Sequence, residues 1–137
     1  MNKNKILLVD DDRFLLDMYS TKFADRGFEV VTVTTGQEAL GKLAGGLMPV
    51  AVVTNIIMPT MDGFQLIQSL RDKGYQHQMA IIILSSLGQK EDIEMGIKLG
   101  IDGYIVKASS TPTEVVERII YIIEQKGVSK PSVPLNQ

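Results

Sequence analysis

Strand-like and helix-like segments alternate five times along the chain, and this alternation restricts the possible folds more than any other feature. The strand-like segments are short apolar runs, and residues 79–84 (MAIIIL) hold six apolar residues without a break. Continuous rather than alternating hydrophobicity indicates strands that are buried on both faces, as in a parallel sheet. The predicted strands are residues 5–10, 28–33, 49–54, 79–84 and 103–106.

The segments between these strands carry apolar residues at helical spacing, with start and stop signals at their ends. Residues 35–38 and 111–114 have the Thr-x-x-Glu spacing of a capping box, and Pro112 strengthens the second start. Glycines at positions 27, 45, 74 and 127 are predicted to end four of the helices. The predicted helices are residues 13–26, 35–45, 64–73, 89–99 and 112–127.

Five such units, joined by right-handed crossovers, predict an α/β fold with a (βα)5 doubly wound, five-stranded parallel sheet of flavodoxin-like type. The expected strand order is 2-1-3-4-5, so function should gather at the carboxyl ends of the strands, near the switch point between the first and third strands. We expect one domain over residues 1–127. Residues 128–137 contain two prolines and no helical period, and are predicted to be a flexible tail or a linker stub.

Composition excludes several classes of function. The formal net charge is −2 and no Lys/Arg cluster is present, which argues against direct binding of nucleic acid. Cysteine is absent, so disulfides and thiolate ligands are excluded, in agreement with a cytoplasmic location. No apolar run approaches the roughly 20 residues that cross a bilayer, and the N-terminus lacks the apolar stretch of a signal peptide.

Three consecutive carboxylates, Asp10, Asp11 and Asp12, directly follow the first apolar run. Like charges side by side repel one another, and a divalent metal ion would offset that repulsion. Mg²⁺ suits this site because it takes oxygen ligands and uses only one or two protein carboxylates with water. The alternative is an acidic turn in which Asp12 is the N-cap of the next helix, and the triplet alone leaves both interpretations open.

Polar residues also follow the other central strands. Asn55 follows the third strand, Ser85 the fourth and Lys107 the fifth. The predicted fold would bring these residues to one edge of the sheet with Asp10 and Asp11, where they could form a cradle for a metal ion and a phosphoryl group. Alone, each has an ordinary interpretation, since Lys107 could be a solvated charge and Ser85 could simply end a strand.

These residues resemble the receiver domain of bacterial two-component response regulators, in particular chemotaxis-regulator-like receivers. The matching segments are residues 6–12 (ILLVDDD), 58–63 (MPTMDG), 84–86 (LSS) and 103–107 (GYIVK). Any one segment is weak evidence. Their order, and their places at the predicted strand ends, make the combination specific, and the resemblance covers residues 5 to about 126.

In such domains an aspartate after the third strand accepts a phosphoryl group from a histidine kinase. The resemblance implies Mg²⁺ as cofactor, bound directly by Asp11 and either directly or through water by Asp10. It further implies that residue 55 and the backbone carbonyl of Ile57 are ligands.

The resemblance also implies roles for three further side chains. Lys107 would pair with a phosphoryl oxygen, and Ser85 would hydrogen-bond the phosphoryl group and pull its loop inward. Tyr104 would change rotamer as that loop moves, remodelling the surface formed by the fourth helix, fifth strand and fifth helix. The implied partners are a sensor histidine kinase or phosphotransfer protein and a downstream protein on that surface, and a homodimer is possible.

The residue at the phosphoacceptor position is Asn55, which stands four residues before Pro59. A carboxylate attacks phosphorus through a negatively charged oxygen, whereas a carboxamide is neutral and cannot form an acyl phosphate. We therefore predict no phosphorylation at position 55. Two explanations remain open: an engineered substitution that traps the unphosphorylated state, or a natural pseudo-receiver that signals by binding alone. Loss of one negative charge should also weaken Mg²⁺ binding.

A second departure from the family pattern is Ala108, because proline with a cis peptide bond usually follows this lysine. A cis bond before a residue other than proline costs about 2.5–4 kcal/mol. We therefore predict a trans bond between Lys107 and Ala108, with a locally rearranged loop.

Three other functions compete with the receiver interpretation. A phosphatase of the haloacid-dehalogenase type shares the Asp-x-Asp spacing of Asp10 and Asp12, but Phe14 stands where a small polar or branched residue is expected. A flavodoxin-like electron carrier is disfavoured, because three aspartates would repel a flavin phosphate. A structural adaptor of this fold would also act by binding alone, so this interpretation merges with that of a pseudo-receiver. We therefore expect a protein that is not an enzyme.

Overall fold

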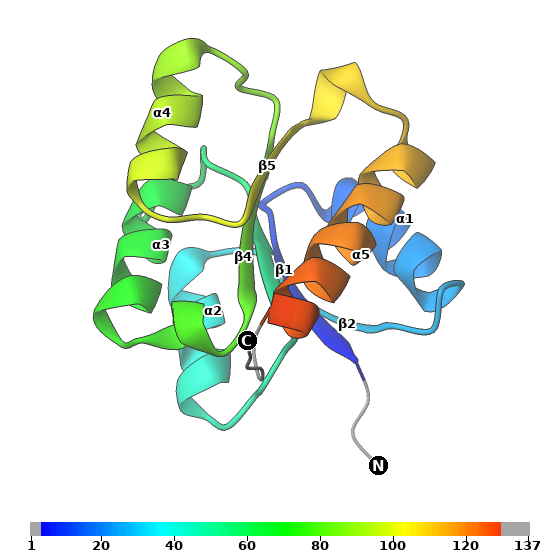
Figure 1. Ribbon diagram of the computed structural model, residues 1–137, viewed down its shortest axis with the longest axis horizontal. Helices are drawn as coiled ribbons and strands as arrows, with labels where there is room; N and C mark the ends of the chain where they lie inside the picture. Colours follow the sequence, from blue (N-terminus) through cyan, green and yellow to red (C-terminus); the bar gives the residue numbers. More distant parts are fainter. Residues whose placement is uncertain (1–3, 130–137) are drawn as a thin grey trace.

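The structure is a computed structural model in which residues 4–129 are described, with side chains described for residues 4–127. Five parallel strands form one sheet in the order β2-β1-β3-β4-β5 (Figure 1), which confirms the predicted fold class and strand order. The strands are β1 (Lys5–Val9), β2 (Glu29–Val33), β3 (Ala51–Thr54), β4 (Ala80–Ser85) and β5 (Gly103–Val106).

Helices cover both faces of this sheet. In Figure 1, helices α2, α3 and α4 lie on one side of the strands and α1 and α5 lie on the other. The elements are α1 (Arg13–Ala24), α2 (Gly36–Ala44), α3 (Gly63–Asp72), α4 (Lys90–Lys98) and α5 (Pro112–Ser129), with the short 3-10 helices η1 (Tyr75–His77) and η2 (Lys107–Ser109).

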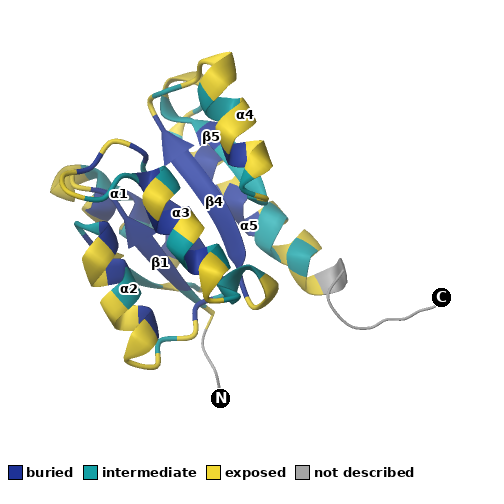
Figure 2. Cartoon of the chain, turned by 90° about the vertical axis from the view of Figure 1, so that its left-hand side faces the viewer, coloured by how far each residue is buried: buried dark blue, intermediate teal, exposed yellow. Residues whose placement is uncertain are grey.

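Each strand contributes to two separate cores. Leu8 belongs to the cluster that packs with Phe23 of α1 and with the apolar face of α5. Its neighbour Leu7 belongs to the cluster that packs with Leu66 of α3 and with α2. Figure 2 shows the strands buried between helices whose outer sides are exposed. Burial on both faces is the physical reason for the unbroken apolar runs in the sequence.

The strand boundaries differ slightly from those predicted. Strand β1 ends at Val9, so Asp10 belongs to the following loop and not to the strand. Strand β4 begins at Ala80 and extends through Ser85, one residue further than predicted. Both shifts affect site residues, because Asp10 lies in the loop after β1 and Ser85 is the last residue of β4.

The predicted end of the last helix at Gly127 is wrong, because α5 continues to Ser129. Glycine lowers helix propensity by only about 1 kcal/mol, and tertiary contacts can offset that loss. The Lys126 ammonium contacts the Asp102 carboxylate at 3.1 Å and the backbone carbonyl oxygen of Gln76 at 2.9 Å, which anchors this end of the helix. Beyond residue 129, the predicted tail lies outside the described residues.

The capping signals were predicted with mixed success. The Thr111–Glu114 box is confirmed by its two reciprocal bonds, of 2.8 and 3.1 Å. At the start of α2, the Thr35 hydroxyl accepts from the Glu38 amide as predicted, but the Glu38 carboxylate accepts from Thr34, one residue earlier. These hydrogen bonds, above all the one from the Thr34 backbone, lower the pKa of Glu38 below its usual value.

No helix in the described part of the chain has the length and apolar character required to span a membrane.

Truncation of a central strand residue tests the two-sided burial. Ile82 of β4 is fully buried, whereas Ile97 of α4 is 66% exposed. We expect Ile82→Ala to lower the free energy of unfolding by about 2–5 kcal/mol. The same truncation at Ile97 should change it by no more than about 0.5 kcal/mol. Urea denaturation followed by circular dichroism measures both values, and equal losses would contradict this packing.

Candidate functional site

The register of the central strands places Asp10 and Asn55 at the starts of adjacent loops. Val9 pairs with Thr54 across β1 and β3, so the next residue of each strand leaves the sheet at the same edge. The Asn55 amide donates to the Val9 carbonyl at 2.9 Å, and the Asp10 amide donates to the Val33 carbonyl at 3.2 Å. The predicted meeting of strand ends at the switch point is therefore confirmed for these two loops.

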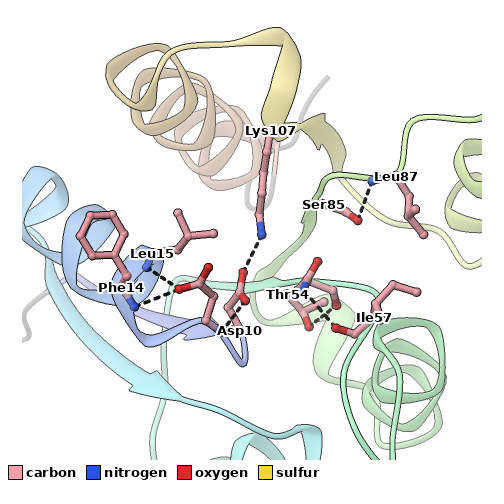
Figure 3. A network of polar contacts seen from close by, with 10 residues as sticks. Asp10, Phe14, Leu15, Thr54, Ile57, Ser85, Leu87 and Lys107 are labelled. Carbon is pink, nitrogen blue, oxygen red and sulfur yellow. Dashed lines mark hydrogen bonds and ion pairs between the residues drawn. The ribbon is translucent and has the colours of Figure 1, made fainter.

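Asp10 is held by hydrogen bonds to both of its carboxylate oxygens. Oδ2 accepts from Lys107 Nζ at 2.8 Å, and Oδ1 accepts from the Asp12 amide at 2.9 Å. Figure 3 shows Lys107 extending from the end of β5 toward Asp10. The side chains of Asp10 and Lys107 are only 7% and 17% exposed, so this is a largely buried ion pair.

The other two aspartates of the triplet differ from Asp10. Asp12 is the N-cap of α1, and its carboxylate accepts from the amides of Phe14 and Leu15 at 3.0 and 3.2 Å. Asp11 is exposed and makes no hydrogen bond or ion pair with another described residue. The capping interpretation therefore holds for Asp12, which leaves Asp10 and Asp11 as the acidic residues of the site.

Asn55 makes a contact that an aspartate could not make. Its side-chain Nδ2 donates to the backbone carbonyl of Ile57 at 3.1 Å. The fully buried Thr54 hydroxyl donates to the backbone carbonyl of Asn55 at 2.9 Å, which fixes the start of the same loop. The amide nitrogen thus satisfies the carbonyl that the family resemblance names as a metal ligand.

The start of α3 supports this loop from the other side. The Gly63 amide donates to the Ile56 carbonyl at 2.7 Å. A Cβ at Gly63 would clash with the Asn55 carbonyl oxygen and would lie 2.9 Å from the Ile56 Cα, so only glycine fits there. Asp62 and Gln65 form a capping box with bonds of 2.8 and 2.9 Å.

Ser85 and Tyr104 are connected through a single residue of the β4–α4 loop. The buried Ser85 hydroxyl accepts from the Leu87 amide at 3.1 Å, and the Tyr104 hydroxyl donates to the Leu87 carbonyl at 2.6 Å. Burial, and secondly the charge of Asp92, raise the pKa of Tyr104 above its usual value. Figure 3 shows the Ser85 hydroxyl turned toward Leu87.

The predicted site residues therefore fall into three contact groups. Lys107 contacts Asp10, Asn55 contacts Ile57, and Ser85 is joined to Tyr104 through Leu87. No hydrogen bond within the described residues connects one group to another. Sequence reasoning missed the supporting contacts of Thr54, Gly63 and Leu87, and only the Asp-x-x-Gln spacing at residues 62–65 offered a signal for any of them.

Tyr19 of α1 is a buried tyrosine whose hydroxyl is sensitive to the charge of Asp10. Burial raises the pKa of its hydroxyl above the usual value, and the negative charge of Asp10 raises it further. Tyr19 belongs to the buried cluster that also contains Phe23 of α1 and Val115 of α5.

The candidate metal ligands of the site are all oxygen atoms, the type of donor that a hard divalent cation prefers. They are the carboxylates of Asp10 and Asp11, the amide oxygen of Asn55 and the carbonyl of Ile57, and Mg²⁺ prefers oxygen ligands. Two of these donors already accept hydrogen bonds, from Lys107 and from Asn55 itself. Within the described residues, no group of three or more His, Cys, Asp or Glu side chains is placed to hold a metal ion.

The peptide bond between Lys107 and Ala108 is trans, as predicted, and no cis bond occurs among the described residues. Lys107 begins the short 3-10 helix η2 (Lys107–Ser109) directly after β5.

Comparison with known proteins identifies the family. Residues 6–120 match the family described as the response regulator receiver domain. The chain belongs to this family. The predicted resemblance to the receiver family is thereby confirmed.

Relatives and solved structures agree with this assignment. A probable transcriptional regulator, ycf27 of Cyanophora paradoxa, is 39% identical over 119 residues, covering 87% of this chain and 48% of that protein. The alkaline phosphatase synthesis transcriptional regulatory protein PhoP of Bacillus subtilis (strain 168) is 32% identical over 132 residues, covering 96% and 53%. The chain thus spans about half the length of the curated relatives it matches.

A CheY-like response regulator receiver domain protein from Methanospirillum hungatei JF-1 has the same fold. Its crystal structure matches with a TM-score of 0.82 at 24% identity and covers 93% of this chain and 98% of that one.

Substitution of Gly63 tests the close approach between α3 and the Asn55 loop of the receiver. Gly63→Ala should lower the free energy of unfolding by about 1–3 kcal/mol, the usual effect of overpacking. Gly41 of α2 has no atom within 4 Å of a Cβ position, so Gly41→Ala serves as the matched control. It should stabilise the protein by about 0.5–1 kcal/mol through helix propensity. Thermal and urea denaturation measure both, and a neutral Gly63→Ala would contradict the close packing.

The raised pKa of Tyr104 predicts a pH-dependent effect of Tyr104→Phe. The folded state holds the hydroxyl proton more tightly than the unfolded state, so this contribution to stability is complete below about pH 10 and is lost as pH rises through the folded pKa. Loss of the bond to Leu87 should cost Tyr104→Phe about 0.5–1.5 kcal/mol at pH 8. Above pH 10 that difference should shrink. Urea denaturation across this range measures it, and a constant difference would contradict the prediction.

Proposed function

We propose that this chain is a receiver module of two-component phosphorelay signalling that does not accept a phosphoryl group at position 55 and acts by binding other proteins. Membership of the receiver family supports the signalling role. The observation that carries the rest is the hydrogen bond from Asn55 Nδ2 to the Ile57 carbonyl. This bond supports the proposal, because the group at position 55 acts in it as a neutral hydrogen-bond donor.

The chemistry of an amide excludes the usual step. Acyl phosphate formation needs an anionic oxygen that attacks phosphorus. The carboxamide of Asn55 carries no charge, and its nitrogen lone pair is delocalised into the carbonyl. The sequence has Asp10, Asp11, Ser85 and Lys107 at the other positions that the family resemblance implies, which supports a receiver that lacks only its nucleophile.

Asp10, Asp11 and the Ile57 carbonyl would hold Mg²⁺ in this site, with the amide oxygen of Asn55 as a weaker fourth donor. When bound, the ion supplies positive charge that offsets the carboxylates. In this proposal Lys107 is the cation that would face an anionic ligand, and Ser85 and Tyr104 are the residues through which the β4–α4 loop changes conformation.

We propose a sensor histidine kinase or a phosphotransfer protein as one partner and a downstream protein as the other. The downstream partner would bind the surface formed by α4, β5 and α5. Exposed apolar side chains support this choice, since Ile97 and Met95 of α4 and Tyr121 of α5 are accessible to solvent. The same surface could form a homodimer. We further propose a cytoplasmic location, no enzymatic activity and no direct contact with nucleic acid.

Incubation with acetyl phosphate and Mg²⁺ tests the proposal. The chain with Asn55 should gain no phosphoryl group at position 55, whereas Asn55→Asp should gain one, because its carboxylate restores the nucleophile. Rapid intact-mass analysis, followed by peptide mapping, measures the product. A phosphorylated peptide that maps to Asn55 would refute the proposal. Failure of Asn55→Asp to react would show that the rest of the site is not competent either.

A further inference from the structure

We propose that residues 130–137 (KPSVPLNQ) bind a cavity at the edge of the sheet where the strands begin, with Leu135 covering Met48. This edge is the opposite one from Asn55, so the inference goes beyond the proposed function and does not depend on it. It assigns a binding site on the domain itself to the segment that follows α5, whereas the sequence predicted a flexible tail or a linker stub.

The cavity has a volume of about 670 Å³, which falls within the usual range for ligand pockets, about 300–1,000 Å³. Its lining comes from the starts of four of the five strands. The lining residues are 4–5 at β1, 29 at β2, 46–50 before β3 and 78–79 before β4. Because the strands are parallel, these starts lie at one edge of the sheet and together form a single hollow.

One wall of this cavity is apolar and is held by hydrogen bonds of the backbone. Its members are Leu47, Met48, Pro49, Val50 and Met79. The Leu47 amide donates to the Lys42 carbonyl at 3.0 Å, and the Val50 amide donates to the Lys5 carbonyl at 2.8 Å, so both ends of the loop are fixed. Met48 lies between them and is 71% exposed. Apolar side chains that cover this wall would remove its apolar surface from water, which is favourable.

The described part of the chain ends close to the cavity. Helix α5 extends to Ser129, and Lys126 in its last turn donates to the Gln76 carbonyl at 2.9 Å. Gln78, two residues further along, lines the cavity. Two residues span at most about 7 Å, and the helix rises only about 5 Å from residue 126 to residue 129. In Figure 1 the last described turn of α5 lies at the same end of the molecule as the start of β1.

Residues 130–137 have the length and the chemistry to occupy the cavity. Pro131 and Pro134 favour an extended chain that rises about 3.1 Å per residue, so the stretch from the end of α5 to Leu135 spans about 19 Å. Val133 and Leu135 supply apolar side chains for the apolar wall. The prolines also reduce the conformational freedom that the segment loses when it binds.

The polar rim of the cavity suits an extended backbone. Asn4 and Lys5 lie on this rim, and their side chains carry N–H donors. A polyproline-type segment makes no internal hydrogen bonds, so its carbonyl groups are available to such donors. Residues 1–3 also adjoin the cavity through Asn4, but they contain only one apolar side chain, that of Met1. The segment after α5 is therefore the better occupant.

Methyl NMR on the full chain tests the inference. With labelled leucine, valine and methionine methyl groups, we expect nuclear Overhauser effects between Leu135 and the methyl groups of Leu47 and Met48. Their absence would overturn the inference. Effects that arise only between differently labelled copies in a mixed sample would overturn it as well, because the occupant would then be a second chain. Contacts from Met1 in place of Leu135 would overturn it in favour of the N-terminal residues.

Leu135→Glu, with Asn136→Glu as its matched control, tests the contribution of the apolar side chain. Loss of a buried leucine should lower the ratio of bound to unbound segment by at least about tenfold, so the backbone amide signals of Leu47 and Met79 should move. Asn136→Glu adds the same charge one residue away and keeps both apolar side chains, so these signals should stay near their original positions. Equal shifts in the two variants, or none in either, would overturn the inference.

Met48→Glu tests the same contact from the side of the cavity. The amide signal of Leu135 should move, because the apolar surface that it covers now carries a charge. Met95→Glu is the control, since Met95 lies on α4 outside the cavity lining and is 46% exposed, and it should leave the Leu135 signal in place. A Leu135 signal that does not respond to Met48→Glu would overturn the inference. None of these variants changes the site around Asn55, so the phosphorylation test is independent of them.

Discussion

The ion pair between Asp10 and Lys107 joins the end of the first strand to the end of the last one. In the sheet, β3 and β4 lie between β1 and β5, so the lysine side chain crosses two strands to reach its partner. This contact exists only because all five strands are parallel and end at the same edge of the sheet. The pair is also largely buried, so one cationic and one anionic side chain hold each other in a fixed place.

The type and order of the elements were predictable from the sequence because both depend on local patterns. Unbroken apolar runs marked the strands, and their burial in two separate clusters explains why no alternation was visible. Element ends were less predictable, since they depend on contacts between distant segments. Helix α5 continues beyond Gly127 because Lys126 is anchored on Asp102. The sequence of the helix alone does not indicate a contact with an aspartate 24 residues earlier.

The site was predictable only in part, for the same reason. The rule that parallel strands end together indicated which residues would meet at one edge, and Asp10, Asn55 and Lys107 do leave the sheet there. The rule does not say which atoms bond. The Ser85 hydroxyl accepts from the Leu87 amide and does not bond to Asp10 or Lys107. Which partner it takes depends on the rotamer of Ser85 and on the turn that follows it. Likewise, the requirement for glycine at position 63 comes from a close approach to the Asn55 carbonyl that no spacing reveals.

The difference between an amide and a carboxylate at position 55 affects both chemistry and structure. On the proposal made above, an NH2 group in place of one carboxylate oxygen leaves position 55 without a nucleophile, and the same NH2 group donates to the Ile57 carbonyl. A site with asparagine therefore has a hydrogen bond within its own loop that an ionised aspartate could not make. The Ser85–Leu87–Tyr104 contacts do not involve position 55, so the loop between β4 and α4 keeps its own connection to β5. On the proposal made above, a protein that binds the α4–β5–α5 surface acts on the Tyr104–Leu87 bond directly, and its effect on the loop requires no phosphoryl group.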